Sequence, residues 1–504
     1  MTVLKRAILF AAALLGLSIS ESIGKEKKPT QPKPIVRTPV ERRHHTLTLE
    51  AAISIALKQN PDILKAIHEI ERTRGQVIEI RAQALPSLQA AGSYTQYDPV
   101  LVRSGSSTST STATSTSDTT TASGTTASSN TVATGTQDKS WRITLQTMQT
   151  VYSGGKVKAA VKIAELTQDT SHQLLRETVA TVIANVRTQF YTALLNRELI
   201  TVAEESIVLL ADQLRDQQNR FDAGTVPRFN VLQAEVALAN SRPDLIRAKN
   251  NFHISRLQLA KTLGLDTEDE PDVAGILRMI PREVNLSRAL TAARKQRAIL
   301  KAQQNTVTGD EQQIIVAKAG YKPSLTADVG YEFVNSRNTS DLAKITNGWY
   351  LGVNGTWAIF DGFKTKGQVI QAKASLASAQ VSLTDGIHQV ELEVQQAYAN
   401  AKVAREVIAS QTKVVEQANE ALRLAKERLN AGAGTQLDVL NAQVALTTAR
   451  STEKRSLSDY NVALAEYDRA TGAETIQDPT LPEPKAKSPV GMLRRGSATL
   501  RPAD

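Results

Sequence analysis

The chain of 504 residues contains no cysteine, and only 4% of its residues are aromatic. The absence of cysteine excludes disulfide bonds, thiolate metal sites and cysteine nucleophiles. Beyond residue 20, no segment is apolar enough to be a transmembrane helix. Any membrane insertion would therefore have to use β-strands, whose backbone groups pair with one another. The scarcity of aromatic residues also favours long helices with narrow contacts over thick globular cores.

The two ends of the chain differ in composition from the rest. Lys5 and Arg6 precede an apolar run over residues 7–17, and the small residues Ser18 and Ser20 follow it. This pattern predicts a cleaved signal peptide over residues 1–20 and therefore an exported protein. We expect a basic, proline-rich N-terminal extension over residues 21–46 and a disordered C-terminal tail over residues 473–504.

The net charge of +10 could indicate nucleic-acid binding, but much of it lies in the N-terminal region. Residues 1–46 contain nine Lys and Arg residues and only three Asp and Glu residues. In the remainder of the chain, charges of both signs are scattered, which is typical of a solvated helical surface rather than a phosphate-binding stripe. We therefore expect no nucleic acid among its partners.

The sequence contains an internal duplication. The segment from Arg220 to Arg242 recurs from Arg428 to Arg450, with 10 of 23 positions identical at an offset of 208 residues. The same offset relates two further pairs, Val151–Lys156 with Ile359–Lys364 and Leu263–Gly264 with Thr471–Gly472. Chance similarity between alanine-rich helices explains scattered matches, but it explains poorly why three motifs share one offset.

Upstream of these motifs the offset is 237, because Pro86-Ser-Leu88 corresponds to Pro323-Ser-Leu325. The difference places extra residues in the first copy, where a Ser/Thr-rich stretch predicts a solvated surface loop over residues 103–139. We therefore divide the chain into a first repeat, 47–265, a linker, 266–285, and a second repeat, 286–472.

Each repeat is predicted to contain the same helices. A helical segment over 47–84 is predicted to break at Asn60-Pro61, since proline disfavours helix before it; its counterpart is 286–319. A long helix over 156–223 contains no Pro or Gly, and its counterpart, 364–431, contains only Gly367 and Gly386. Returning helices end near Gly264 and Gly472. The helices alone are equally compatible with a coiled-coil rod.

Two short strands are predicted in each repeat, at about 86–97 and 140–149 and at about 323–334 and 348–358. Apolar and polar residues alternate in these segments, as in strands with one buried face. All three tryptophans of the chain lie in them. The residues predicted to face lipid are Tyr94, Trp141, Ile143, Leu145, Tyr331, Phe333, Trp349 and Trp357. A soluble sheet covered by helices is the alternative.

Strands of about nine residues with aromatic ends are typical of a membrane β-barrel wall. Four strands are too few to close a barrel, and open strand edges are not tolerated in lipid. Several copies of the chain would therefore have to contribute strands to one barrel. This reasoning predicts an oligomer in contact with outer-membrane lipid.

No catalytic arrangement stands out, and we predict that the chain is not an enzyme and binds no cofactor or metal. The six histidines are dispersed, except for His44 and His45. The motif Ser153-Gly-Gly-Lys156 superficially resembles a phosphate-binding loop. It lacks the first glycine, at Thr150, and the Ser or Thr after the lysine, at Val157.

Taken together, these motifs resemble the TolC-type outer membrane efflux protein family. The resemblance covers residues 47–472 and rests on the order and duplication of motifs that include Leu49–Leu57 with Asn60-Pro61, Leu85–Leu88, Val151–Lys156 and Ile359–Gly362. It implies a mainly α fold with a small β part. Three copies would form a 12-stranded β-barrel in the outer membrane, continuous with a 12-helix α-barrel tunnel in the periplasm. The partners implied are a periplasmic adaptor protein and an inner-membrane pump.

The resemblance also implies roles for residues near the two helical hairpin turns. Asp438 aligns with a pore-facing gate aspartate, Asn230 is its counterpart in the first copy, and Asn441 replaces a second gate carboxylate. Asp438 could equally be an ordinary polar residue at a helix N-terminus. Gly434 and Leu429 stand where an arginine and an aromatic residue hold the aperture shut in the family, so the same latch is not expected.

The turns themselves, Gly224-Thr225-Val226 and Gly432-Ala433-Gly434-Thr435, are the candidates for adaptor docking, with plain turn chemistry as the alternative. The predicted function is a passive exit duct for efflux or type I secretion. The alternative is a structural periplasmic coiled-coil spacer or surface adhesin. The sequence does not identify the cargo.

Overall fold

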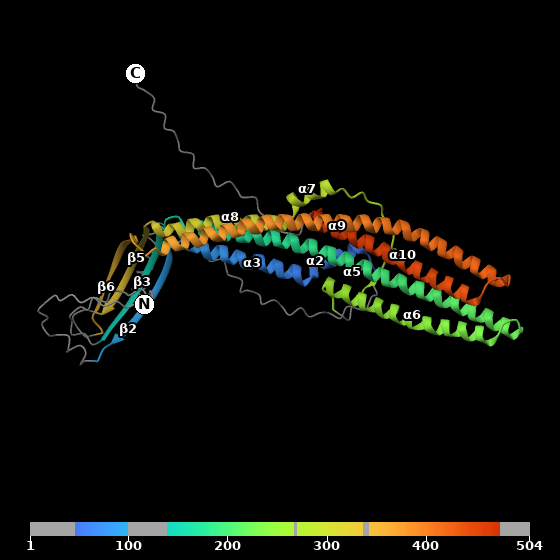
Figure 1. Ribbon diagram of the computed structural model, residues 1–504. Helices are drawn as coiled ribbons and strands as arrows, with labels where there is room; N and C mark the ends of the chain where they lie inside the picture. The colour runs from blue at the N-terminus through green and yellow to red at the C-terminus, as the bar shows by residue number, and fades with distance from the viewer. Residues whose placement is uncertain (1–45, 99–138, 267–269, 336–341, 474–504) are drawn as a thin grey trace, which may run out of the picture. The chain divides into compact units, whose positions relative to one another are not determined.

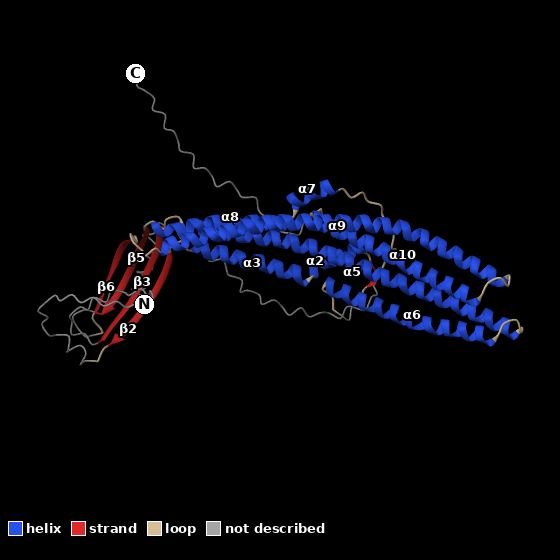
Figure 2. Ribbon diagram, viewed as in Figure 1, coloured by secondary structure: helices blue, strands red, loops and turns tan. Residues whose placement is uncertain are grey.

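The computed structural model describes residues 46–98, 139–266, 270–335 and 342–473. All of them belong to one unit that begins at Thr46. The predicted signal peptide, N-terminal extension, Ser/Thr-rich loop and C-terminal tail lie outside the described residues, apart from the boundary residues Thr46, Lys139 and Ala473. The described chain is mainly helical with a small amount of sheet (Figures 1 and 2).

The elements follow one order twice. The first series is α2 (Leu49–Gln59), α3 (Pro61–Ala82), β2 (Ser87–Gln96), β3 (Lys139–Tyr152), α5 (Lys156–Asp222) and α6 (Arg228–Leu263). The second series is α7 (Leu286–Gln296), α8 (Ala298–Lys318), the short 3₁₀ helix η1 (Ala319–Tyr321), β5 (Ser324–Asn335), β6 (Ile345–Thr356), α9 (Lys364–Asn430) and α10 (Gln436–Thr471).

The two longest helices, α5 and α9, each contain 67 residues, which corresponds to about 100 Å at 1.5 Å per residue. Gly367 and Gly386 do not interrupt α9. Gly386 instead allows a close approach, because a Cβ atom there would lie 2.1 Å from the Gln303 side-chain oxygen of α8. Helices α8 and α10 each pack against both α5 and α9.

The predicted helix break at Asn60 is confirmed. Asn60 ends α2 and caps α3: its Oδ1 accepts hydrogen bonds from the Asp62 and Ile63 amides at 2.8 and 3.3 Å. Pro61 occupies the first helical position, where its missing N–H costs nothing. The equivalent break in the second copy was not predicted, because a single helix was expected over 286–319. Arg297 separates α7 from α8 there, without a proline.

The duplication is repeated in the tertiary contacts around these breaks. The Asn60 side-chain amide donates to the Thr262 carbonyl oxygen at 2.7 Å, and Arg297 donates to the Ala470 carbonyl oxygen at 3.4 Å. Thr262 and Ala470 are 208 residues apart, while Asn60 and Arg297 are 237 apart. The same contact therefore occurs once in each copy, between a residue related by the offset of 237 and a residue related by the offset of 208.

Glycine ends the returning helix at each junction. Gly264 and Gly472 follow α6 and α10 with φ of 77° and 66°, in the left-handed region that favours glycine. At Gly264 the backbone also approaches closely, because an added Cβ would lie 2.3 Å from the Gln59 carbonyl oxygen. Glycine is therefore required there both by conformation and by space.

Residues 270–285 of the predicted linker are bonded to the helices at several points. Strand β4 (Asp272–Val273) pairs in parallel with β1 (Thr46–Leu47). The Arg197 guanidinium donates to the carbonyl oxygens of Val273 and Gly275. The Tyr460 hydroxyl, on α10, donates to the Ile280 carbonyl oxygen at 2.9 Å. The apolar core nearby joins α2, α5, α6 and β4 through fully buried residues that include Leu194, Leu259 and Val273.

The strands β2, β3, β5 and β6 form one antiparallel sheet in that order. Each copy contributes a neighbouring pair of strands, and the two copies join between β3 and β5. The outer edges of the sheet are those of β2 and β6.

Candidate functional site

One face of the four-stranded sheet is apolar across all four strands. The register pairs Tyr94 with Trp141, Ile143 with Phe333, and Leu145 with Tyr331, which in turn pairs with Trp349. Residues paired directly across antiparallel strands point to the same side of the sheet. Seven of the eight residues predicted to face lipid therefore share one face: Tyr94, Trp141, Ile143, Leu145, Tyr331, Phe333 and Trp349.

This apolar face is exposed within the described chain, most strongly along β6. Trp349, Leu351 and Val353 are 75%, 66% and 68% exposed. Such a continuous exposed apolar surface indicates an interaction surface rather than ordinary solvent contact. Trp357, the eighth predicted residue, lies one position beyond β6. Its indole nitrogen donates to the Tyr321 carbonyl oxygen at 3.1 Å, so it anchors the end of the strand to η1.

The opposite face of the sheet is polar, and its side chains bond to one another across the strands. Arg142 Nε lies 2.9 Å from Glu332 Oε1, and Asn354 donates to Asp328 at 2.7 Å. The Tyr350 hydroxyl donates to Gln146 at 2.9 Å. The sheet therefore has one apolar face and one polar face.

The turn between the first strand pair and α5 contains Ser153-Gly-Gly-Lys156, the motif that superficially resembles a phosphate-binding loop. Gly154 and Gly155 have φ of 64° and 94°, and the Ser153 hydroxyl accepts the Val157 amide at 3.3 Å. In the second copy the Asp361 carboxylate takes this capping role and accepts from the Thr365 amide at 2.8 Å. Hydrogen bonds from the Thr365 side chain and backbone lower the pKa of Asp361.

At their other ends, α5 and α9 finish in two turns of the same design. We call residues 223–227 the first tip and residues 431–435 the second tip. Gly224 and Gly432 both have φ of 75°. The amides of Thr225 and Ala433 donate to the carbonyl oxygens of Arg220 and Arg428, both at 2.9 Å. The residues predicted to dock an adaptor form these turns, exposed or half-buried: Gly224, Thr225, Val226, Gly432, Ala433, Gly434 and Thr435.

Asp438, the predicted gate residue, forms a capping box at the start of α10. Its carboxylate accepts the Thr435 amide at 2.9 Å, and the Thr435 hydroxyl accepts the Asp438 amide at 3.2 Å. Hydrogen bonding of the Asp438 carboxylate to the Thr435 backbone and side chain, with a smaller contribution from the charge of Arg428, lowers the pKa of Asp438. Asp438 and Asn441 are exposed, and Asn230 is half-buried near the first tip.

The two tips are joined within the chain. Arg220 donates through Nη2 to the Asn430 side-chain oxygen at 2.6 Å. The buried side-chain amide of Gln213, on α5, donates to the side-chain oxygen of Gln436, the first residue of α10, at 2.8 Å. Polar contacts therefore align the ends of α5, α9 and α10.

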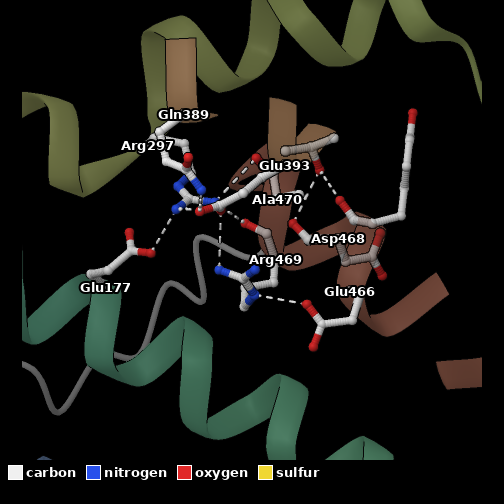
Figure 3. Close-up of polar contacts among 10 residues, drawn as sticks. Glu177, Arg297, Gln389, Glu393, Glu466, Asp468, Arg469 and Ala470 are labelled. Carbon is white, nitrogen blue, oxygen red and sulfur yellow. Dashed lines mark hydrogen bonds and ion pairs between the residues drawn. The ribbon is translucent and has the colours of Figure 1, made fainter. Parts of the chain in front are cut away.

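A cluster of charged side chains, centred on the buried Arg297, lies around the helix break at that residue (Figure 3). The Arg297 side chain is 5% exposed and lies 3.0 Å from Glu177 of α5 and 3.1 Å from Glu393 of α9. Arg469 of α10 lies 3.5 Å from Glu393 and 2.9 Å from Glu466. Burial alone would lower the pKa of Arg469, but these carboxylates raise it.

The neighbouring carboxylate of Asp468 holds two further cations, Arg187 at 3.0 Å and Arg282 at 2.6 Å. Arg187 belongs to α5 and Arg282 to the linker. This set of charges therefore ties both long helices, α10 and the linker to one point. Within the described residues, no group of three or more acidic and histidine side chains is placed to hold a metal ion. No helix in the described ranges is both long and apolar enough to cross a bilayer.

Comparison with known proteins identifies the family. Residues 52–265 and 289–473 match the family described as outer membrane efflux protein, and these two segments cover well over half of the chain. The chain belongs to this family. The two matched segments begin within α2 and α7 and end just beyond α6 and α10, so each contains one copy of the duplicated unit.

Two curated members of the outer membrane efflux protein family are similar in sequence. The chain is 26% identical to outer membrane efflux protein BepC of Brucella suis over 37% of its length. It is 23% identical to outer membrane protein TolC of Vibrio cholerae over 59% of its length. The matched region spans 40% of the first protein and 69% of the second.

The fold is also that of solved outer-membrane channels. The CmeC outer membrane channel of Campylobacter jejuni superposes with a TM-score of 0.68, covering 84% of this chain and 85% of that one at 18% identity. At this identity the similarity establishes the fold only.

Sequence reasoning missed the charge cluster in this efflux family member. Its central residue, Arg297, corresponds to Asn60 at the offset of 237, so the duplication could have marked it as a helix break. The partners Glu177 and Glu393 could not have been found in this way, because only the tertiary packing of α5 and α9 brings them together.

Proposed function

We propose that the chain is the outer-membrane exit duct of a tripartite efflux or type I secretion system. It passively conducts cargo delivered by an inner-membrane pump and a periplasmic adaptor. The observation that carries this proposal is the two-faced sheet, with exposed Trp349 and Leu351 on one side and bonded polar groups on the other. Such a sheet fits between lipid and a water-filled lumen.

Three copies would complete the channel. Four strands leave two open edges, at β2 and β6, which lipid does not tolerate. Joining β6 of one copy to β2 of the next gives a barrel of 12 strands, and the helices continue it as a 12-helix tunnel through the periplasm. Outer-membrane lipid would then contact the apolar face of the sheet, and the adaptor would dock at the first and second tips.

Electrical recording tests the duct. Purified protein reconstituted in a planar lipid bilayer is expected to form trimers and to give discrete single-channel conductance steps. A periplasmic spacer or adhesin gives no conductance. A protein that remains monomeric and soluble without detergent would contradict the proposal.

Asp438 is proposed to line the narrow periplasmic opening of this duct, together with Asn230 and Asn441. Three carboxylates near one axis would favour cations. The variant Asp438→Asn retains an oxygen that can accept the Thr435 amide but removes the charge. We expect a lower cation preference, measured as a reversal potential across a salt gradient, with an intact start of α10.

The matched control is Asp244→Asn, which removes the same charge from the middle of α6. It is expected to leave the reversal potential unchanged.

Because hydrogen bonds lower the pKa of Asp438, the contribution of its cap to the stability of α10 is present above the ordinary aspartate range. This contribution is lost as the pH falls through the lowered pKa. Unchanged ion selectivity in Asp438→Asn would remove this residue from the gate.

A further inference from the structure

The first copy of the duplicated unit contacts the second through α5 and α10. The contacts run along both helices in antiparallel order: Gln213 with Gln436 at 2.8 Å, Ser206 with Thr447 at 3.4 Å, and Glu198 with Lys454 at 3.0 Å. Because α9 is the copy of α5 and α6 is the copy of α10, the duplication implies an equivalent contact between α9 and α6.

Within one chain, the surfaces that this second contact would use are open. Helix α9 packs against α7, α8 and α10, whereas α6 packs against α5 and α2. The α10 residues that face α5, including Gln436, Leu440, Gln443 and Ser458, are buried. Their counterparts on α6, 208 residues earlier, are all exposed: Arg228, Leu232, Glu235 and Asn250.

The long helices show the same difference. On α5, Val202 and Gln213 are buried and Ser206 is half-buried. Their counterparts on α9 are exposed: Ser410, Ala421 and Val414, which corresponds to Ser206. The counterpart of Ser206, 208 residues later, is Val414, and the counterpart of Thr447, 208 residues earlier, is Ala239. The contact between Ser206 and Thr447 therefore corresponds to one between Val414 and Ala239, two small apolar side chains suited to close helix packing.

The clearest predicted contact between two copies lies beside the tips. Arg220 binds Asn430 within the chain, and the residues 208 positions away from these two are Arg428 and Asp222. Both side chains are exposed. Within the described residues neither forms an ion pair, and Arg428 donates only to the Ala433 carbonyl oxygen at 3.3 Å. The corresponding contact between Arg428 and Asp222 would join two opposite charges, and would therefore be stronger than the bond from the Arg220 guanidinium to the neutral Asn430 amide.

We propose that the exposed face of α9 docks on α6 of a second copy of this chain, in the register of α5 on α10, with Arg428 of one copy paired with Asp222 of the next. The inference rests on the proposed assembly of identical copies and adds its register and its contact at the tips. A repeated head-to-tail contact forms a ring when its rotation closes, as it does in the proposed trimer. One ring of such pairs then fastens the tips together.

One pair of residues that this register brings together carries charges of the same sign, and it provides a test of the register. Glu205 and Arg450 form an ion pair at 2.6 Å within the chain, but their counterparts are Lys413 and Arg242, two cations. Lys413→Glu is therefore expected to stabilise the assembly and to raise the temperature at which trimers dissociate on denaturing gels. Lys426→Glu, the same charge change at an exposed position on another face of α9, is the control and is expected to have a smaller effect.

Cross-linking tests the contact at the tips directly, because the chain has no cysteine of its own. Asp222→Cys and Arg428→Cys are combined in the full chain, purified in detergent and treated with a short bis-methanethiosulfonate reagent. A spacer is needed because an arginine–aspartate pair separates the Cβ atoms by more than a disulfide spans. We expect cross-linked dimers and trimers on denaturing gels.

Two further cysteine pairs serve as controls for the cross-linking. Arg220→Cys with Asn430→Cys should cross-link within the chain and give no larger species. Asp222→Cys with Glu420→Cys lies about 12 Å out of register along α9 and should give little product. Trimers by light scattering that fail to cross-link through positions 222 and 428 would overturn this inference and leave the proposed duct intact. Monomers would overturn both.

Charge exchange supplies an independent readout. Arg428→Asp or Asp222→Arg alone places like charges together and should lower the dissociation temperature of the trimer. The double exchange should restore most of the loss, as expected for residues in contact. Additive losses in the double variant would show that the two residues do not meet.

Discussion

Replacing Leu351 with arginine is expected to prevent stable insertion of the chain into the outer membrane. Leu351 lies in the middle of β6 on the apolar face and is 66% exposed. If this face contacts lipid, an arginine near the bilayer midplane costs about 2–4 kcal/mol in each copy, and the cost is paid three times per trimer. The measurement is the amount of trimer recovered from outer-membrane fractions.

The matched control lies on the same strand and the opposite face. Asn354 is bonded to Asp328 on the polar side of the sheet, where an arginine would meet water and a carboxylate. Asn354→Arg is therefore expected to insert normally. Equal recovery of Leu351→Arg and Asn354→Arg would mean that the apolar face does not contact lipid, and a soluble sheet covered by another partner would become the better explanation.

The faces of the sheet could be predicted from the sequence because strand alternation is a local property. The alternation from Trp141 to Leu145 places these side chains on one side whatever the strand pairs with. The order in which the strands pair could not be predicted in this way, because it depends on residues that are far apart in the sequence. The pairing of Leu145 with Tyr331 joins residues 186 positions apart, and only this register makes the apolar side chains of the two copies one surface.

The helices show the same division between local and distant information. The long uninterrupted segment beginning at Lys156 predicted α5, because it contains no residue that ends a helix. The break at Asn60 was predictable from Pro61. The break at Arg297 has no such signal, since Arg297 makes no capping bond to α8 and is held instead by carboxylates from α5 and α9.

Asp438 shows why the site was harder to predict than the fold. Its spacing from Thr435 fits a capping box, in which the residue three positions after the cap bonds back to it. The structure establishes that role in the single chain. A gate is a property of three copies around an axis, so neither the sequence nor one chain alone displays it.

Replacing Arg297 with methionine is expected to destabilise the helical part of the chain strongly. The change leaves the carboxylates of Glu177 and Glu393 facing each other without their shared cation. We expect a loss of about 3 kcal/mol, the lower end of the range for breaking a buried ion pair, because the two carboxylates are 19% and 25% exposed. Denaturant unfolding followed by circular dichroism measures it.

Two further variants separate the charges from the helix break itself. Arg297→Asn recreates the residue of the first copy and can satisfy the backbone at the break. It still removes the cation from Glu177 and leaves Glu393 with only Arg469, at 3.5 Å, so this variant should remain destabilised. Adding Glu177→Gln and Glu393→Gln to Arg297→Met removes the stranded charges and should recover much of the lost stability, since buried ion pairs are often replaceable by neutral groups. If Arg297→Asn alone were as stable as the unmodified chain, Arg297 would act only as the counterpart of Asn60. Its ion pairs with the two glutamates would then contribute nothing to stability.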